Sequence, residues 1–559
     1  MSGRIRLDAA TRLVCLARAV LCDSIAQGAP APRAREAAGA RCRVNVTVIT
    51  AACVRASMSG RGTSLAEAVR VAARHAAADR RFGAPLSVAE LARARVEVWI
   101  CRSTAALRSL RGLDLGLHGV ELRRGRRGAY FKPSVALTQN YGRADLLLER
   151  LCLKAGLERE DWRAPDTLIR RTIWEHFTEA GPNSSSVVQL ARLRPVDVPA
   201  LNAAALRERI RWAAARLVNA QQPDWLFLYQ YHPFRPLTQP PAPQLVRQAG
   251  TAFGLARAAA LGDAAAARAA LRAAEALLGL AVPGAGGGLH LANGKDPAPL
   301  GAGALLSAAL ELADADGRLA RARESLRAGL LARQTAEGAF LCHTDSVSPE
   351  ADGAAQDFFP GEAMMALALA LSHAAAEVRP ALRRAFAYYR AHFRRAPATA
   401  FIVWQTEAAR LYLDWLRAHD PGSPEIAALT RVVFAMIDWL LPLQLDEASA
   451  RHPHFAGGFA RGHPPGYSSA VFTEAVALGA GIAARAGDAR RARRYAAAAR
   501  RGLLFTMRLQ IVPETAFLFP EPALTVGGTT ASLSDLTIRC DFDQHAITAY
   551  AAGLGLCRG

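Results

Sequence analysis

The C-terminal two-thirds of the sequence alternates between two kinds of helical segment. One kind is rich in Ala and Gly and poor in charge, and the other is amphipathic and rich in Arg, as in 318–334 and 378–395. A helix that is apolar on all sides lies enclosed among its neighbours, whereas a helix with an arginine face lies outside. The enclosed segments number six: 247–261, 300–313, 360–375, 401–413, 468–484 and 542–556.

The order of these segments predicts a closed ring. The last enclosed segment has no outer helix after it, but 205–221 supplies an extra outer helix ahead of the first. Six enclosed and six outer helices are the elements of an (α/α)6 toroid. A generic helical solenoid is the alternative, because any array of helical hairpins alternates in this way. The helices also repeat in sequence, since four helix ends carry Gln before a short polar turn, at 216–228, 330–341, 440–450 and 505–519.

The N-terminal part has a different sequence pattern. Segments in which apolar and polar residues alternate, as in strands, are mixed with helical segments. A stretch of Gly, Pro and Ser at 179–187 has the composition of a linker. We therefore predict two domains, an α+β domain at 8–195 and an all-α toroid at 200–559. The strand segments are 43–50 and 95–101, and the helical segments are the amphipathic N-terminus, 64–78 and 144–157.

The N-terminal segments carry short motifs in a fixed order. They comprise D-x-R-F, P-L, E-L before a strand, an h-G-h-x-h turn, P-x-V and an L-C-x-K-A-G-L helix. In this order they resemble the AMMECR-type domain, the family of the AMME-syndrome candidate protein. The motif residues are Asp79, Arg81, Phe82, Pro85, Leu86, Glu90, Leu91, His118, Gly119, Pro133, Val135 and 151–157.

The resemblance implies a functional turn, L-R-G-C-I-G, whose counterpart here reads "VRASMSG". Arg55 is kept, but Ser57 stands where the family has Cys. A serine without an adjacent base is a weaker nucleophile than a cysteine beside an arginine. Arg55, Ser57 and His118 are the predicted residues of a pocket in this domain. The resemblance also implies a functional link to radical-SAM and Memo-type proteins.

The C-terminal part resembles the toroids of six-hairpin glycosidases and terpenoid cyclases. The segments that carry this resemblance contain "FPGEAMMALA", "VWQTEAARLYL" and "IRCDFDQHAITA". The Gln-plus-aromatic helix ends also resemble the Gln-Trp repeats of triterpene cyclases. The resemblance implies a central cavity that binds a carbohydrate or a terpenoid.

In such a ring the enclosed helices run in one direction, so their N-termini gather at one mouth, where the helix dipoles add positive potential. Acids, amides and aromatic rings around a cavity are typical of a carbohydrate site, and two carboxylates can divide the acid and base roles. Each acid could instead cap its own helix. The candidates for catalysis are Glu362, Asp357 and Asp541, and those for substrate binding are Arg539, His545, Trp404, Gln405, Glu407, Arg247 and Glu474, with Lys295 and Asp296 ahead of the second helix.

Three functions fit these observations. The first is an enzyme that binds and processes a carbohydrate or polysaccharide, as a hydrolase, lyase or epimerase. The second is a non-catalytic binding or scaffold protein with a degenerate AMMECR-like domain. The third is a terpene cyclase, which needs an acidic D-x-D-D motif, but "DFDQ" places Gln544 at the last acid and only 7% of residues are aromatic.

Composition and charge narrow the possible ligands, partners and location of the protein. The net charge of +21 favours an anionic or sugar ligand. Nucleic acid is not predicted as a partner, because the arginines are spread along many helices and arise from the codon bias of a GC-rich genome. Asp8 interrupts any signal-peptide core, and no uncharged apolar stretch is long enough to span a membrane, so we predict a cytoplasmic protein. The spacing of the nine cysteines predicts neither a metal site nor disulfides, and no cofactor is predicted.

Overall fold

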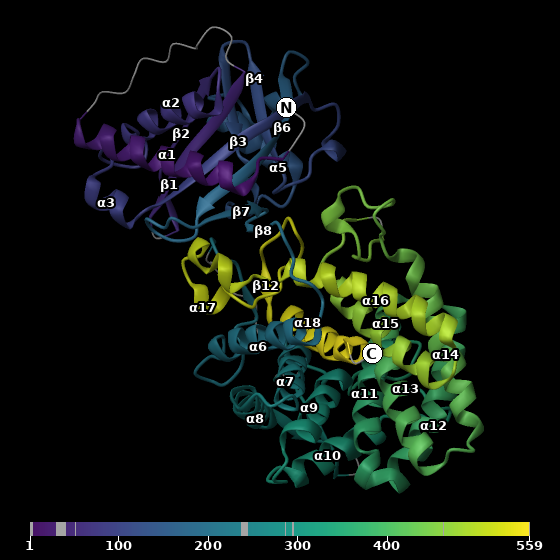
Figure 1. The fold of residues 1–559 in the computed structure, drawn as a ribbon. Helices are drawn as coiled ribbons and strands as arrows, with labels where there is room; N and C mark the ends of the chain where they lie inside the picture. The colour runs from purple at the N-terminus through teal and green to yellow at the C-terminus, as the bar shows by residue number, and fades with distance from the viewer. Residues whose placement is uncertain are drawn as a thin grey trace.

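The computed structural model describes residues 4–28, 41–50, 52–235, 244–284, 287–292, 294, 296–461 and 463–557. Lys295 therefore lies outside the described residues. A domain built on a β-sheet contains the N-terminus, and a ring of helices follows it, as Figure 1 shows. The two predicted classes, α+β followed by all-α, are both confirmed.

The N-terminal domain is an antiparallel sheet with helices on one face (Figure 1). Val44, Val46 and Val48 of one strand are fully buried in the core that the helices share with the sheet. The strand order is β2 (Cys53–Gly62), β1 (Cys42–Thr50), β3 (Arg95–Ala106), β6 (Leu168–Glu179), β4 (His118–Arg124), β5 (Arg127–Phe131), with β7 (Val187–Ala191) and β8 (Arg194–Pro195) paired beyond β6; the helices are α1 (Leu7–Ala26), α2 (Leu65–Ala77), α3 (Val88–Arg93), α4 (Pro133–Thr138) and α5 (Ala144–Lys154).

The segment "VRASMSG" is a strand, whereas the sequence suggested a turn. It lies within β2 and pairs with β1, with Ser57 opposite Thr47. The glycines of this strand let α2 pack closely, because a β-carbon at Gly60 would lie 2.2 Å from the carbonyl oxygen of Ala68. Ser57 alternates with the buried Ala56, so it points to the sheet face opposite α2.

The C-terminal domain is a closed ring, which confirms the predicted toroid. Each enclosed helix contacts the next, and the last contacts the first. The helix from the extra outer segment, α6, contacts both α18 and α7 and so closes the outer layer. The inner helices are α7 (Leu245–Ala259), α9 (Leu300–Ala313), α11 (Phe359–Leu369), α13 (Thr399–His419), α15 (Ser468–Arg485) and α18 (Cys540–Gly553); the outer helices are α6 (Ala203–Asn219), α8 (Ala264–Leu278), α10 (Ala320–Leu331), α12 (Leu371–Arg395), α14 (Pro424–Leu440) and α16 (Ala489–Leu509).

The repeated glutamines tie four of the six outer helices, α6, α10, α14 and α16, to the next outer helix around the ring. In all four helix ends, the side-chain amide donates to a backbone carbonyl in the segment that follows the helix and to one in the neighbouring outer helix. The repeat seen in the sequence is therefore a repeated hydrogen-bond arrangement. The pairs across helices are Gln221 to Ala269 (3.1 Å), Gln334 to Ala381 (2.8 Å), Gln444 to Ala498 (2.9 Å) and Gln510 to Arg209 (3.0 Å).

Among the described residues one helical segment, Pro424–Leu443, is long and apolar enough by composition to cross a membrane, and one such helix is weak evidence of a span. It consists of α14 and the turn after it, and α14 packs against α13 and α15 as an outer helix.

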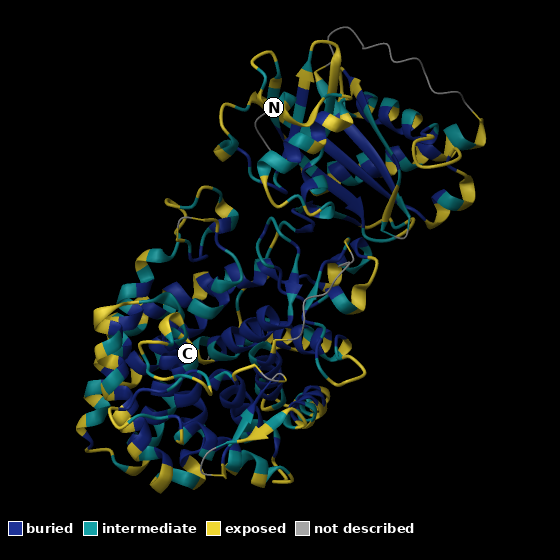
Figure 2. Ribbon diagram, turned by 180° about the vertical axis from the view of Figure 1, so that it is seen from behind, coloured by how far each residue is buried: buried dark blue, intermediate teal, exposed yellow. Residues whose placement is uncertain are grey.

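The two domains meet at an excursion of the ring. Between α16 and α18 the chain leaves the outer layer and forms the short helix α17 (Pro522–Thr525) and strand β12 (Ile538–Arg539), which pairs with β9 (Gln230–Tyr231). Ile511, Phe519 and Leu536 of this excursion share one apolar cluster with Leu137 and Leu190 of the N-terminal domain. Figure 2 shows buried residues through the cores of both domains.

Candidate functional site

A cavity of about 400 Å³ opens at the mouth where the inner helices begin. It is lined by residues from the first two turns of the six inner helices, with Leu305 as the contribution of α9. The common direction of the inner helices, which the sequence predicted, therefore brings their N-termini around one space. The polar and aromatic lining residues are Gln244, Arg247, Phe358, Phe359, Glu362, Thr399, Trp404, Tyr467, Ser468, Phe472, Gln544 and His545.

Glu362 places a carboxyl group in this cavity. It stands in the first turn of α11, only 4% of its surface is exposed, and its Oε2 atom has no hydrogen-bond partner among the described residues. Burial raises the pKa of Glu362 to about 8, and the charge of Arg247 opposes this only in part. The side chain is therefore a neutral carboxylic acid at pH 7 and can donate a proton to a ligand.

His545 places an imidazole in the same cavity, with its ring 5.7 Å from the ring of Trp404. Burial lowers the pKa of His545 to about 4, although the charge of Asp541 opposes this. The imidazole is therefore neutral at pH 7 and keeps a lone pair that can accept a proton. The cavity thus combines a neutral acid with a neutral base, the pairing that acid–base chemistry requires.

Asp541 holds two arginines and does not line the cavity. Its side chain is 1% exposed and accepts hydrogen bonds from Arg247 at 2.8 Å and from Arg539 at 2.6 and 2.9 Å. The guanidinium of Arg539 lies over the rings of Phe542 and Tyr229, at 4.5 and 5.1 Å. Arg247 lines the cavity with 38% of its side chain exposed. Asp541 therefore acts as a positioning residue that fixes Arg247 at the cavity wall.

Two other predicted site residues also lie outside this lining. Asp357 hydrogen-bonds through Oδ1 to Nε2 of His392, at 3.1 Å, on the outer helix α12. Gln405 follows the cavity-lining Trp404 but is 3% exposed, and its Nε2 has no partner among the described residues. Position near a helix N-terminus brought these residues to the correct end of the ring but not into the cavity.

Glu407 and Glu474 form a layer further along their helices than the cavity. Burial would raise the pKa of Glu407, but the charges of Arg410 and Arg257, at 2.7 and 3.4 Å, hold it at about 2. Glu474 accepts a hydrogen bond of 2.5 Å from Thr548, and burial, with the charge of Glu407, raises its pKa to about 8. Glu407 neutralises its arginines, Glu474 connects α15 to α18 through Thr548, and neither glutamate lines the cavity.

Asp543, the second acid of "DFDQ", is also held in an ion pair. Asp543 is fully buried and pairs with Arg216 of α6 at 3.0 Å, so it joins the first helix of the ring to the last. Its Oδ1 also accepts from the backbone of Thr529 at 2.6 Å. Burial raises the pKa of Asp543 to about 6, and Arg216 opposes this. Neither acid of this motif lines the cavity, which argues against the proton donor of a terpene cyclase.

The predicted residues of the N-terminal domain do not form one pocket, because His118 lies on a different part of the sheet from Arg55 and Ser57. Arg55 donates to Glu90, at 2.7 Å, the same carboxylate that completes the capping box of α3. His118 begins β4, accepts a hydrogen bond of 3.0 Å from the backbone of Asp114, and is separated from β2 by three strands. Burial lowers the pKa of His118 to about 4. These contacts are structural.

Residues 14–175 match the model of the AMMECR1 family. The resemblance predicted from the order of the motifs is confirmed for this part of the chain.

Within this AMMECR1-like domain, Ser57 stands in a polar cluster that the sequence did not reveal. Its hydroxyl lies 3.2 Å from that of Thr47 and 3.4 Å from Oδ1 of Asn45. Lys132 donates to both Thr47 and Asn45, the latter at 3.1 Å. Burial lowers the pKa of Lys132 to about 8, and the charge of Glu97 opposes this. The rarity of lysine, which occurs at three positions in the chain, was the only signal that could have drawn attention to Lys132.

No curated protein matches this chain. Solved structures match each domain separately. The uncharacterized protein PH0010 from Pyrococcus horikoshii is 22% identical and covers 34% of this chain and 98% of its own, with a TM-score of 0.30. A D-mannose isomerase is 15% identical over 64% of this chain and 100% of its own, with a TM-score of 0.46. An α-1,6-mannanase of a Salegentibacter species is 10% identical over 64% and 100%, with a TM-score of 0.41.

Proposed function

We propose that the cavity at the mouth of the ring binds a carbohydrate and that Glu362 and His545 act on it as acid and base. The observation that carries this proposal is a neutral carboxylic acid and a neutral imidazole in one cavity. Trp404 and Tyr467 offer aromatic faces for sugar rings, and Arg247 offers a charged donor for a hydroxyl or carboxylate.

The lining favours proton transfer over hydrolysis by two carboxylates. Glu362 is the one carboxyl group among the described residues that line the cavity. An inverting or retaining glycosidase needs a second carboxyl on the other side of the scissile bond. An isomerase or epimerase needs a base that takes a proton next to a carbonyl and an acid that protonates the carbonyl oxygen. His545 and Glu362 have the proton states for these two steps, which give an enediol that is reprotonated at the neighbouring carbon.

The test measures binding and turnover in the full chain. Thermal unfolding is followed with aldoses, ketoses, uronic acids and mannooligosaccharides, and isomerisation by NMR in D₂O, where proton transfer exchanges the C2 proton. We expect a sugar to raise the midpoint of the wild type. Glu362→Gln and His545→Asn should each abolish turnover. Glu474→Gln is the matched control, because Glu474 is an equally buried glutamate with its pKa also raised to about 8, but it does not line the cavity.

The result decides between the candidate functions. Binding without exchange in D₂O would make this a sugar-binding module, the scaffold alternative. No stabilisation by any sugar, or equal loss in Glu474→Gln and Glu362→Gln, would contradict the proposal.

A further inference from the structure

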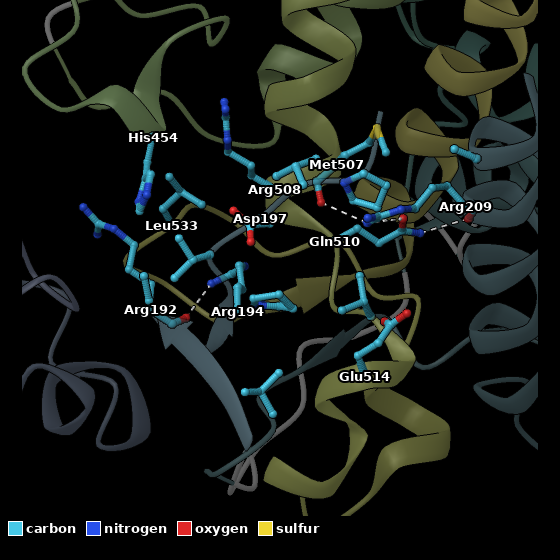
Figure 3. Close-up of a pocket in the computed structure, with 18 of the residues that line it drawn as sticks. Arg192, Arg194, Asp197, Arg209, His454, Met507, Arg508, Gln510, Glu514 and Leu533 are labelled. Atoms are coloured by element: carbon cyan, nitrogen blue, oxygen red, sulfur yellow. Dashed lines mark hydrogen bonds between the residues drawn. The ribbon is translucent and has the colours of Figure 1, made fainter. Parts of the chain in front are cut away.

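A second cavity, of about 250 Å³, lies where the two domains meet, as Figure 3 shows. One wall comes from the β7–β8 hairpin of the N-terminal domain and the segment that follows it. The opposite wall comes from α6, from the end of α16 and from the loop that carries His454. The cavity is therefore complete only when both domains are in place.

The hairpin supplies two buried arginines to this cavity. Arg192 is 4% exposed and Arg194 is 6% exposed. Arg192 donates to the carbonyl of Leu115 at 2.6 Å, and Arg194 donates to the carbonyl of Arg192 at 3.0 Å and to the hydroxyl of Thr530 at 2.5 Å. The Nε atoms of both arginines and Nη2 of Arg192 have no partner among the described residues. Each guanidinium therefore keeps at least one buried donor without a partner.

Two more arginines line the opposite wall. Arg209 donates to the carbonyl of Met507 at 3.0 Å, and Arg508 donates to that of Ala456 at 3.2 Å. In the described part of the chain, none of the four guanidinium groups has a carboxylate within 4.0 Å, and the oxygens to which they donate are neutral. The acids in the lining, Asp197, Glu208 and Glu514, are exposed.

Burial lowers the pKa of Arg192 to about 10 and that of Arg194 to about 9, so both stay charged at pH 7. The charge of Asp114 opposes this effect for Arg192 only in part, and a buried ion without a paired counter-ion is destabilising. Neighbouring like charges add to this cost. An anion held between the guanidinium groups would offset both terms.

The backbone of the hairpin is held in an unusual conformation. Arg192 and Leu193 are the two loop residues between β7 and β8, and both have positive φ, 55° and 61°. Two-residue hairpin loops of this kind favour Asn and Gly, since other side chains are strained there. Strain of this kind gathers at functional sites. Here it accompanies the two arginines that enter the cavity.

We propose that this cavity binds a small phosphorylated organic molecule between the two domains. Arginine guanidinium groups donate pairs of hydrogen bonds to phosphate oxygens. A phosphate dianion neutralises the charge of several arginines better than a single carboxylate does. The volume admits a small metabolite and not a polymer. Trp212, Met507 and Leu533 add an apolar wall for the organic part of the ligand.

The test is calorimetric titration of the full chain with phenyl phosphate, inorganic phosphate and benzoate. We expect saturable binding of phenyl phosphate, with inorganic phosphate weaker because it leaves the apolar wall unused, and benzoate weaker because it carries one charge. Arg194→Gln and Arg508→Gln should each weaken phenyl phosphate by about tenfold or more. Arg508 is half-buried, so its variant keeps the proposal testable if Arg194→Gln fails to fold.

Arg333→Gln is the matched control. Arg333 is also buried, donates to a carbonyl at 2.9 Å and has an unpartnered Nη1, but it lies outside this cavity. Arg333→Gln and Glu362→Gln should both bind phenyl phosphate as the wild type does. The second of these results separates this proposal from the proposal for the cavity of the ring. No heat at millimolar phenyl phosphate, equal binding of benzoate, or unchanged affinity in both cavity variants would overturn the proposal.

Discussion

The carboxyl group of Glu362 lies against the backbone of Gly301 on the neighbouring inner helix. A β-carbon built at Gly301 would stand 2.0 Å from Oε2 of Glu362 and 2.6 Å from Cδ1 of Phe359. The missing side chain at Gly301 is therefore what leaves room for the acid of the cavity. It also lets α9 and α11 pack closely, in the manner of a small-residue helix contact.

Gly301→Ala tests this relationship. The added methyl group must displace the Glu362 carboxyl or part the helices, and we expect a loss of about 1–3 kcal/mol in the free energy of unfolding. Sugar affinity should fall with it. The control is Gly303→Ala on the same helix, where the nearest atom to the new β-carbon is 4.0 Å away. Replacing that helical glycine should be neutral or stabilising by up to about 1 kcal/mol. Denaturant unfolding measures the change in the free energy of unfolding for both variants. Equal changes in the two variants would contradict the packing argument.

Glu362 should also make stability depend on pH. The pKa of its carboxyl rises from 4.5 to about 8 on folding, so the folded state binds more protons between these values. The contribution is fully present below pH 4.5 and is lost as the pH rises through 8. Each unit of pKa is about 1.4 kcal/mol, so the loss is on the order of several kcal/mol.

The measurement is the free energy of unfolding of the wild type and Glu362→Gln on both sides of this window. The variant cannot titrate at this position, so its stability should fall less with rising pH. Parallel pH profiles for the two proteins would show that the carboxyl is ionised in the folded state.

The repeated glutamines give a prediction about the ring itself. Gln221 donates to the carbonyl of Trp225 at 2.9 Å and to that of Ala269, in the next outer helix, at 3.1 Å. Gln221→Ala leaves both carbonyls without this donor and should cost about 1–3 kcal/mol. Its neighbour Gln222 is exposed and donates only to Ala220, at 3.3 Å. Gln222→Ala should therefore change stability by less than about 0.5 kcal/mol. Thermal unfolding compares the two, and a larger loss in Gln222→Ala would contradict the role assigned to the repeat.

The ring could be predicted from the sequence because its signal is local and repeated. Enclosed helices need small apolar residues on every side, so each of the six inner helices could be recognised from its own composition. The extra outer segment ahead of the first inner helix then predicted that the ring closes. The direction of the helices follows from alternation. That was enough to gather Glu362, Trp404, Arg247 and His545 around one cavity.

The contacts between side chains were beyond the sequence. Asp541 and Asp357 stand near helix starts as Glu362 does, but their partners, Arg539 and His392, are fixed by rotations and packing that no spacing encodes. The cavity between the domains was missed for the same reason. One of its arginines, Arg508, lies hundreds of residues beyond the other three, and each looked like one more basic residue in an arginine-rich chain.

Ser57→Cys tests the polar cluster of the AMMECR1-like domain by introducing the cysteine that the family resemblance implies at this position. The introduced thiol would replace a hydroxyl 3.2 Å from Thr47, which itself binds the Lys132 ammonium, and Arg81 donates to the carbonyl of Ser57. Positive charge favours the thiolate, so the pKa of this thiol should lie below the ordinary value of about 8.5.

Alkylation rates measured by peptide mass spectrometry across pH report that pKa, and the exposed Cys53 of the same strand is the internal reference. Adding Lys132→Met should raise the pKa again, because it removes the charge and keeps the length of the side chain. If the introduced thiol reacts like Cys53 and ignores the loss of Lys132, the cluster has no electrostatic effect on position 57, and the serine there is only a structural replacement.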